Sequence, residues 1–374
     1  MQGIECKKAP FLKQPYNFLT YNYLFNMKKK FLLLLLAAST YSIASKAQDT
    51  VKTTQDAPLV LYGSVDTYYK DDFSGHANIP TSFASDNNSV SIGMIDLGLK
   101  KTVGNASFVG EMSFGPRNDQ SIPTAGYHIQ NLYVSYAFSP KFSATAGYMS
   151  TFIGYEVISP TGNFNYSTSY LFTNGPFQNA GLKFTYAFSD KVSLMAGIFN
   201  DEWNVYTSQH DVSTFGAQLT ITPVKNWTAY LNVATGPTSG TEFDLTTAYQ
   251  ITSAFKLGLN AATYSTTHYS AGFSGVALYP QIAVSKAVTL GLREEYFKSD
   301  NGTALSTYAP VGPLPGGSVL ASTLTANIKA GPLTLIPEVR LDGINKQQYS
   351  SFTNSSGDPT KSASQFVLAV VYGF

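Results

Sequence analysis

The clearest alternation of hydrophobic and polar positions lies in residues 179–200. Apolar side chains fill every second position from Ala180 to Phe188, and smaller or charged groups such as Lys183 fill the positions between them. The same alternation runs through residues 192–198, after only three polar residues. Period-two alternation predicts strands with one apolar and one polar face, and so short a connection predicts that the two strands pair antiparallel.

This alternation recurs along most of the chain and predicts about sixteen strands, with 14 to 18 left open. The predicted strands cover residues 59–69, 92–101, 106–114, 129–138, 142–152, 179–188, 192–200, 215–222, 227–233, 243–251, 255–263, 276–284, 288–297, 320–329, 333–341 and 365–374. Long aliphatic and aromatic side chains occupy one face, whereas small and charged ones occupy the other. The pattern predicts an all-β, transmembrane antiparallel β-barrel, in which lipid covers the apolar face and water fills the lumen.

The connections between the predicted strands alternate in length. Short turns fall near 103–105, 139–141, 189–191, 285–287 and 330–332. Long loops rich in Gly, Pro, Asn and Ser cover 71–89, 153–178, 298–318 and 342–364. This asymmetry is typical of bacterial outer-membrane barrels, which have short periplasmic turns and long external loops.

Aromatic residues near the strand ends predict two girdles at the membrane interfaces. The short-turn girdle would contain Phe138, Phe142, Phe188, Trp227 and Phe255, and the long-loop girdle Phe152, Phe199, Trp203, Tyr264, Tyr296 and Phe297. The chain also ends on an alternating apolar strand that closes with Phe374. This ending resembles the terminal signal by which the β-barrel assembly machinery recognises outer-membrane proteins, so we expect that machinery to be a partner.

The N-terminal region predicts export. Met27 is followed by three lysines, an apolar stretch over 31–38 and the small-x-small triplet that ends at Ala47. These are the three parts of a secretory signal peptide, with cleavage after Ala47. Residues 1–26 then fit a mis-assigned upstream start, and residues 48–374 a single outer-membrane barrel domain. The only cysteine, Cys6, lies in the upstream segment.

Composition excludes several other classes. Only 13% of the residues are charged and 14% are aromatic, which argues against a disordered chain. Removing residues 1–47 leaves 17 basic and 22 acidic residues, a formal charge of −5, which gives no footprint for nucleic acid. No nucleophile elbow, zinc-protease or phosphate-loop motif occurs, and the four histidines lie in or beside different long loops. We therefore expect no catalytic, metal or cofactor site.

Residues 146–156, 163–172 and 181–200 resemble the OmpL-like β-barrel porin family, with the closest likeness over about 144–203. The resemblance implies a porin in the outer membrane of a Gram-negative bacterium. In general porins of this strand number the third long loop often folds into the lumen. Here that loop is 153–178, and Glu156 is its only charged residue. The same analogy implies a homotrimer.

Strand parity places most charged strand residues on the lumen face, because a charge facing lipid near the midplane costs about 2–4 kcal/mol for Lys or Arg. These residues are Asp66, Asp96, Glu111, Lys183, Asp244, Arg293, Glu295, Glu338 and Arg340. We hypothesise an eyelet in which Arg293, Arg340 and Lys183 face Glu156 across water and set a transverse field. Glu111, Glu295 and Glu338 are further candidates for lining the pore. The alternative is that all of these are ordinary hydrated residues of a wide pore.

The sequence therefore favours an outer-membrane porin that lets small hydrophilic solutes or ions diffuse passively. One alternative is a surface binding or adhesion protein, in which the barrel only anchors long external loops. An outer-membrane enzyme is a third hypothesis.

Overall fold

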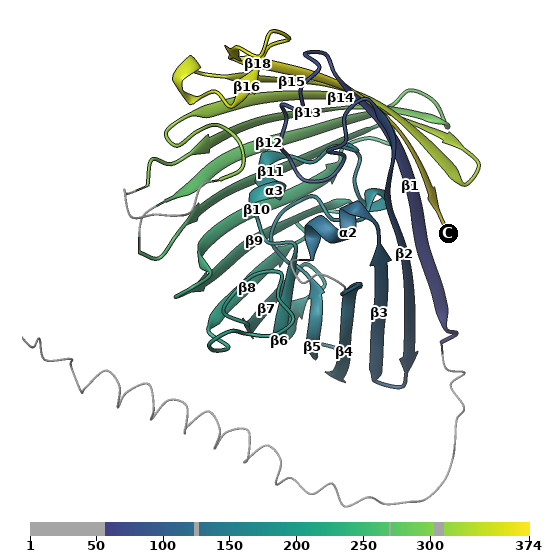
Figure 1. The fold of residues 1–374 in the computed structure, drawn as a ribbon. Helices are drawn as coiled ribbons and strands as arrows, with labels where there is room; N and C mark the ends of the chain where they lie inside the picture. The colour runs from purple at the N-terminus through teal and green to yellow at the C-terminus, as the bar shows by residue number, and fades with distance from the viewer. Residues whose placement is uncertain (1–56, 123–126, 269–270, 303–309) are drawn as a thin grey trace, which may run out of the picture. The chain divides into compact units, whose positions relative to one another are not determined.

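The computed structural model describes residues 57–122, 127–268, 271–302 and 310–374. Within these residues, sixteen strands form one closed barrel (Figure 1). The strands are β1 (Val60–Asp72), β2 (Ser89–Val103), β3 (Ala106–Phe114), β4 (Ile129–Ser139), β5 (Phe142–Ser150), β6 (Gln178–Ser189), β7 (Val192–Phe199), β8 (Thr214–Ile221), β9 (Trp227–Gly236), β10 (Gly240–Gln250), β11 (Phe255–Ser265), β12 (Gly272–Ala283), β13 (Val288–Ser299), β14 (Ser318–Ala330), β15 (Leu333–Ile344) and β18 (Ser362–Gly373). The predicted upstream segment and signal peptide lie outside the described residues and stay predictions.

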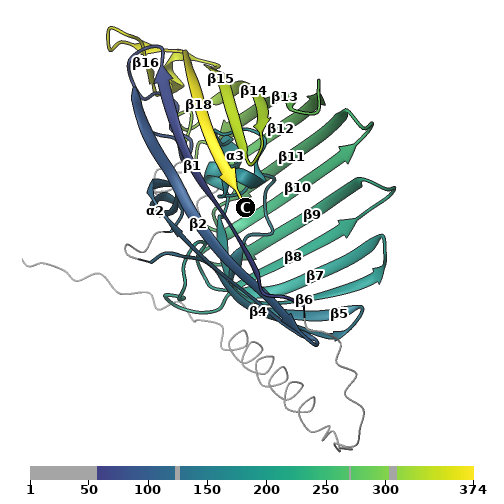
Figure 2. The same cartoon turned by 90° about the vertical axis from the view of Figure 1, so that its right-hand side faces the viewer.

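Each barrel strand pairs antiparallel with the next one along the chain, as Figure 2 also shows. The first and last strands close the ring, with Ser64 opposite Gly373 and Asp72 opposite Gln365. At the end of this seam the backbones of Gly63 and Phe374 exchange two hydrogen bonds of 3.1 and 3.0 Å. The closed antiparallel barrel confirms the fold predicted from the alternation, and the strand number agrees with the prediction.

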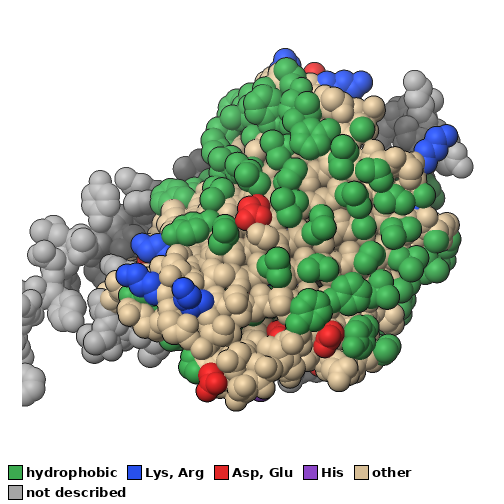
Figure 3. Space-filling model, turned by 90° about the horizontal axis from the view of Figure 1, so that it is seen from above, with side chains coloured by type: hydrophobic (Ala, Val, Ile, Leu, Met, Phe, Trp, Pro, Cys, Tyr) green, Lys and Arg blue, Asp and Glu red, His purple; other side chains and the backbone are tan. Residues whose placement is uncertain are grey.

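The two faces of the wall differ as the alternation predicts. Outward side chains such as Val134 and Leu324 are 61% and 58% exposed, and hydrophobic side chains spread over the outer face in Figure 3. Inward side chains such as Arg293 and Glu338 are buried. Lipid contact explains the exposed apolar wall, since a soluble fold would cover it.

The aromatic girdle at the short-turn ends is present on the outer face, where Phe138 and Phe188 are each 55% exposed. The predicted girdle at the long-loop ends is wrong for Phe199, Tyr264 and Phe297, which are 1%, 9% and 0% exposed, and for Phe152, whose ring packs against Phe199 inside the barrel. Neighbours in a strand point to opposite faces, so Phe297 must point inward once Tyr296 points outward. These inward aromatics pack against loops inside the barrel.

Short elements interrupt the long loops. They are α2 (Pro116–Ser121), η1 (Pro160–Gly162), α3 (Tyr170–Asn174), η2 (Gln347–Tyr349) and the two-stranded sheet of β16 (Phe352–Thr353) and β17 (Pro359–Thr360). In the described residues no helix has the length and apolar character needed to cross a membrane. The connection between β5 and β6, residues 151–177, is hereafter the inserted loop; it carries α3 into the interior of the barrel (Figures 1 and 2).

Candidate functional site

A buried ion pair joins the inserted loop to the barrel wall. Nη1 of Arg293 on β13 lies 2.7 Å from Oε1 of Glu156, and both side chains are at least 95% buried. The same guanidinium also donates to the Ser167 carbonyl at 2.6 Å. One wall arginine therefore holds two points of the loop that are eleven residues apart in the chain.

Wall carboxylates accept backbone N–H groups of the same loop. Glu338 on β15 accepts from the amides of Tyr166 and Ser167 at 2.9 and 3.1 Å. Glu295 on β13 accepts from the amides of Tyr170 and Leu171, at the start of α3, at 2.9 and 2.8 Å. An irregular loop has no strand partner for its backbone, and these carboxylates satisfy donors that burial would otherwise leave unpaired.

The other two arginines of the chain also hold this loop. Arg340 on β15 pairs with Asp342 at 2.8 Å and donates to the Thr168 carbonyl at 2.8 Å. Arg117 on α2 donates to the Ile158 carbonyl at 3.2 Å, and its guanidinium lies 4.9 Å from the centre of the Tyr166 ring. All three arginines thus donate to the inserted loop, and the role of Arg117 was not predicted from the sequence.

Two loop tyrosines complete the seat. The hydroxyl of Tyr166 donates to Asp66 at 2.5 Å, and that of Tyr170 donates to Asp342 at 2.7 Å. Burial raises the pKa of both hydroxyls well above 10, with the neighbouring carboxylates adding to the shift. Both tyrosines therefore stay neutral donors at any physiological pH.

Glycines on the lumen face make room for the loop's side chains. A methyl group at Gly291 would lie 2.2 Å from the Phe164 ring, and one at Gly258 would lie 2.2 Å from the Tyr155 hydroxyl. A methyl group at Gly216 would likewise lie 2.5 Å from the Phe152 ring. These three glycines come from β13, β11 and β8, so the wall is shaped for the loop along much of its course.

The two larger cavities inside the barrel lie against the opposite wall, and a smaller one of about 380 Å³, lined by Glu156, Phe164 and Lys256, lies on the seat side. One cavity of about 570 Å³ is lined by Asp96, Gln130 and Ser159, among others. We call it the loop-side cavity. A second of about 550 Å³, here the wall-side cavity, is lined by Lys100, Tyr133 and Lys183. Both cavities share Tyr62, Glu111, Asn131 and Ser150.

Glu111 stands at the junction of these cavities. Its carboxylate accepts hydrogen bonds from the Tyr62 hydroxyl at 3.1 Å and from the Asn131 amide at 3.0 Å. The Tyr62 ring can reach it because Gly98 has no side chain: a methyl group there would lie 2.2 Å from the ring. The carboxylate is thereby fixed in place at the centre of the open space.

The structure divides the predicted pore residues into two groups. Arg293, Glu156, Arg340, Glu295 and Glu338 are buried in the loop's seat, so Arg293 and Arg340 do not face Glu156 across open water, as the eyelet hypothesis required. The alternative of ordinary hydrated wall residues fails for the four of them that lie on the wall, Arg293, Glu295, Glu338 and Arg340, which are at most 1% exposed. Glu111 and Lys183 instead line open cavities.

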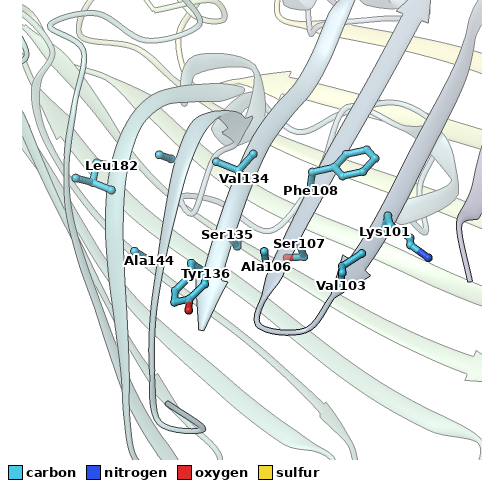
Figure 4. Close-up of a pocket in the computed structure, with 11 residues that line it drawn as sticks. Lys101, Val103, Ala106, Ser107, Phe108, Val134, Ser135, Tyr136, Ala144 and Leu182 are labelled. Carbon is cyan, nitrogen blue, oxygen red and sulfur yellow. The ribbon is translucent and has the colours of Figure 1, made fainter. Parts of the chain in front are cut away.

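A further hollow, of about 480 Å³, lies on the outer face over β2 to β6. Figure 4 shows Phe108, Val134, Tyr136 and Leu182 around it, with the small side chain of Ala144 between them. These side chains belong to the lipid-facing set, and the hollow is separated from the lumen by the wall. It is a feature of the outer surface of the barrel.

In the part of the chain that the structure describes, no group of three or more His, Cys, Asp or Glu residues is arranged to hold a metal ion. A closed antiparallel barrel with an apolar outer wall, a polar lumen and a loop seated inside it defines the class of outer-membrane porins. The family model described as "Putative beta-barrel porin-2, OmpL-like" matches residues 58–374. The chain belongs to this family, and it functions as an outer-membrane porin.

Solved porin structures have the same fold. The anion-selective porin from Comamonas acidovorans is 12% identical, with 85% of this chain and 99% of that chain covered and a TM-score of 0.58. OmpF of Salmonella typhi, in complex with daunomycin, is 12% identical over 85% and 100% of the two chains, with a TM-score of 0.57. The trimer form of Vibrio cholerae OmpT is 11% identical over 85% and 99%, with a TM-score of 0.52. No curated protein matches the chain.

Proposed function

We propose that small hydrophilic solutes cross this porin passively, between the inserted loop and the wall formed by β1 to β6. The observation that carries the proposal is the position of the loop's seat, most of which lies on β8 to β15, with Asp66 of β1 as a further contact. Ion pairs, carboxylate–amide bonds and glycine gaps fix the loop against β8 to β15. The polar cavities around Glu111 lie on the other side of it.

In this proposal Glu111 and Lys183 are pore-lining residues, whereas Glu156, Arg293, Glu295, Glu338 and Arg340 set the width of the passage by holding the loop. Solutes need no chemical step, and their gradient is the only energy source. We accordingly propose a non-enzymatic channel that works without a cofactor in the outer membrane, after signal cleavage near Ala47.

Conductance of the purified, refolded protein in planar bilayers tests the proposal, together with swelling of proteoliposomes in sugar solutions. We expect stable single-channel steps and swelling rates that fall as the sugar becomes larger. A surface adhesin anchored by a plugged barrel would give neither result, so silent bilayers and unswollen liposomes would exclude the transport role.

We further propose that the chain assembles as a homotrimer, as the trimer form of Vibrio cholerae OmpT does. The apolar outer wall supplies a surface that lipid or another copy can cover. Chemical cross-linking in the native membrane tests this proposal, and a monomeric band alone would contradict it.

A further inference from the structure

The open side of the lumen contains charged groups that no opposite charge neutralises. Within the described residues, Asp96, Lys100, Glu111 and Lys183 take part in no ion pair with an N···O distance of 4.0 Å or less. Arg293 and Arg340, by contrast, each lie 2.7 or 2.8 Å from a carboxylate. A paired charge projects only a weak field, so these four unpaired groups, which line the two cavities directly, set the field that a solute meets there.

The signs of these four charges are separated in space. The loop-side cavity is lined by Asp96 and Glu111 and by no lysine or arginine. The wall-side cavity is lined by Lys100 and Lys183, and Glu111 stands at its border with the first cavity. A solute that moves from one cavity to the other therefore leaves an acidic region and enters a basic one.

The inserted loop adds no charge of its own to this path. Its residues on the loop-side cavity are Val157, Ile158, Ser159 and Thr161, all uncharged. Its single charged residue, Glu156, is held by Arg293. The loop thus narrows the passage, while the wall alone supplies its charge pattern.

We infer that Asp96 and Glu111 on one side and Lys100 and Lys183 on the other form a charge-separated filter that favours small dipolar solutes, those carrying both an ammonium and a carboxylate group. A simple cation is attracted to the first pair and repelled by the second, and an anion meets the reverse. A zwitterion can orient each of its charges toward a favourable pair. This inference rests on the proposed solute path.

The filter predicts that the wild-type channel distinguishes weakly between K⁺ and Cl⁻. Removing charge from either pair should make the channel selective for the ion that the remaining charges attract. One unit charge about 6 Å from a permeating ion in a water-filled passage changes its permeability about threefold. Glu111→Gln should lower the K⁺ permeability and raise the Cl⁻ permeability about threefold each, and so shift the K⁺/Cl⁻ permeability ratio about tenfold toward Cl⁻. The double variant Lys100→Gln plus Lys183→Gln should shift it toward K⁺ by a similar or larger factor.

Reversal potentials in a KCl gradient, recorded near 0.1 M salt so that screening stays modest, measure these shifts. Lys286→Gln, in the exposed turn between β12 and β13, removes a lysine away from both cavities and should leave the ratio unchanged. Equal ratios in the wild type and in both lumen variants, with normal conductance, would overturn the filter. Absence of any conductance in the wild type would instead refute the proposed passage.

Swelling of proteoliposomes tests the solute class, with glycylglycine as the zwitterion and arabinose as an uncharged solute of similar size. We expect the wild type to admit glycylglycine faster relative to arabinose than either charge variant does. An identical ratio of the two rates in all three proteins would overturn the preference for dipolar solutes.

Discussion

The guanidinium of Arg293 lies 2.7 Å from the carboxylate of Glu156, with the arginine 0% and the glutamate 5% exposed. The two residues are 137 positions apart in the chain, and their contact fixes the first part of the inserted loop to β13. The pair is a structural clamp on the width of the lumen. Its removal should therefore change how wide the passage is and how steadily it stays open.

Arg293→Gln should release part of the loop. Loss of one partner from a buried ion pair costs about 3–5 kcal/mol, because the remaining charge stays buried and unpaired. We expect a larger mean single-channel conductance with more frequent transitions between levels, measured in planar bilayers. The barrel itself should remain folded, since its strand pairing does not involve this pair.

The double variant Arg293→Gln plus Glu156→Gln distinguishes two effects of Arg293→Gln. One is the loss of the ion pair, and the other is the cost of leaving the Glu156 carboxylate buried without a partner. The double variant removes both charges and should give a quieter channel than Arg293→Gln alone. Lys329→Gln, on the lumen face at the end of β14, serves as a charge-loss control. If Arg293→Gln conducted as quietly and at the same level as the control, the clamp would have no influence on the passage.

The glycine gaps give a second way to unseat the loop. Gly291→Ala places a methyl group where the Phe164 ring now lies, and overpacking of this kind costs about 1–3 kcal/mol. We expect greater current noise in bilayers because the loop shifts from the wall. The companion variant Gly291→Ala plus Phe164→Ala removes the collision.

Gly110→Ala, on the lipid-facing side of β3, is the control for adding a methyl group to a strand glycine, because the nearest atom to that methyl group is 3.9 Å away. Noise that rises equally in Gly291→Ala and Gly110→Ala would mean that the lumen glycines act through the backbone and not through space for the loop. Lower current noise in Gly291→Ala plus Phe164→Ala than in Gly291→Ala alone would support the described contact between Gly291 and Phe164.

The strands were predictable because the polarity of each residue indicates which face of the strand it occupies. Lipid on one side and water on the other select alternate side chains, so Leu182 and Lys183 identify their faces without knowledge of any distant contact. The error at Phe297 has the same root: an aromatic side chain was assigned by its nearness to a strand end, although the parity of Tyr296 already placed it inside.

The partners of the inserted loop could not be predicted in this way. Strand parity placed Arg293 and Glu338 on the lumen face, but which charge meets which depends on the curvature and stagger of the closed barrel. One signal was available in the sequence: Gly258 and Gly291 occupy lumen-facing positions of otherwise regular strands. Glycine in a strand interior often marks the close approach of another segment.

The predicted export signal gives a test that is independent of the barrel. If the segment before Gln48 is a signal peptide cleaved after Ala47, protein isolated from outer membranes should begin at Gln48. Intact-mass measurement and N-terminal sequencing check this. Ala47→Trp should leave an uncleaved form, because the cleavage site needs a small residue there. A native protein that begins at Met1 or Met27 would contradict the prediction.

The loop between β7 and β8 is organised by the buried carboxylate of Asp201. It accepts hydrogen bonds from the Ser208 hydroxyl at 2.6 Å, from the His210 ring nitrogen at 3.0 Å and from backbone amides of residues 209 and 210. The bond from Ser208, with those from His210 and Gln209, outweighs burial and lowers the pKa of Asp201 well below its ordinary value of 3.8. Its contribution is therefore fully present above that value and is lost only as the pH falls through the lower pKa of the folded protein.

Two results are therefore expected when cleavage of residues 200–213 by an external protease is followed in intact proteoliposomes. Between pH 7 and about pH 4.5, protonation of Asp201 should not speed cleavage of the wild-type loop, because the carboxylate stays ionised throughout this window. Asp201→Asn, which replaces charge-assisted hydrogen bonds with weaker ones, should be cleaved about tenfold faster even at pH 7. Asp211→Asn makes the same change of charge at an exposed position of the same loop and should leave the rate unchanged. Equal cleavage of the two variants would show that Asp201 does not hold the loop.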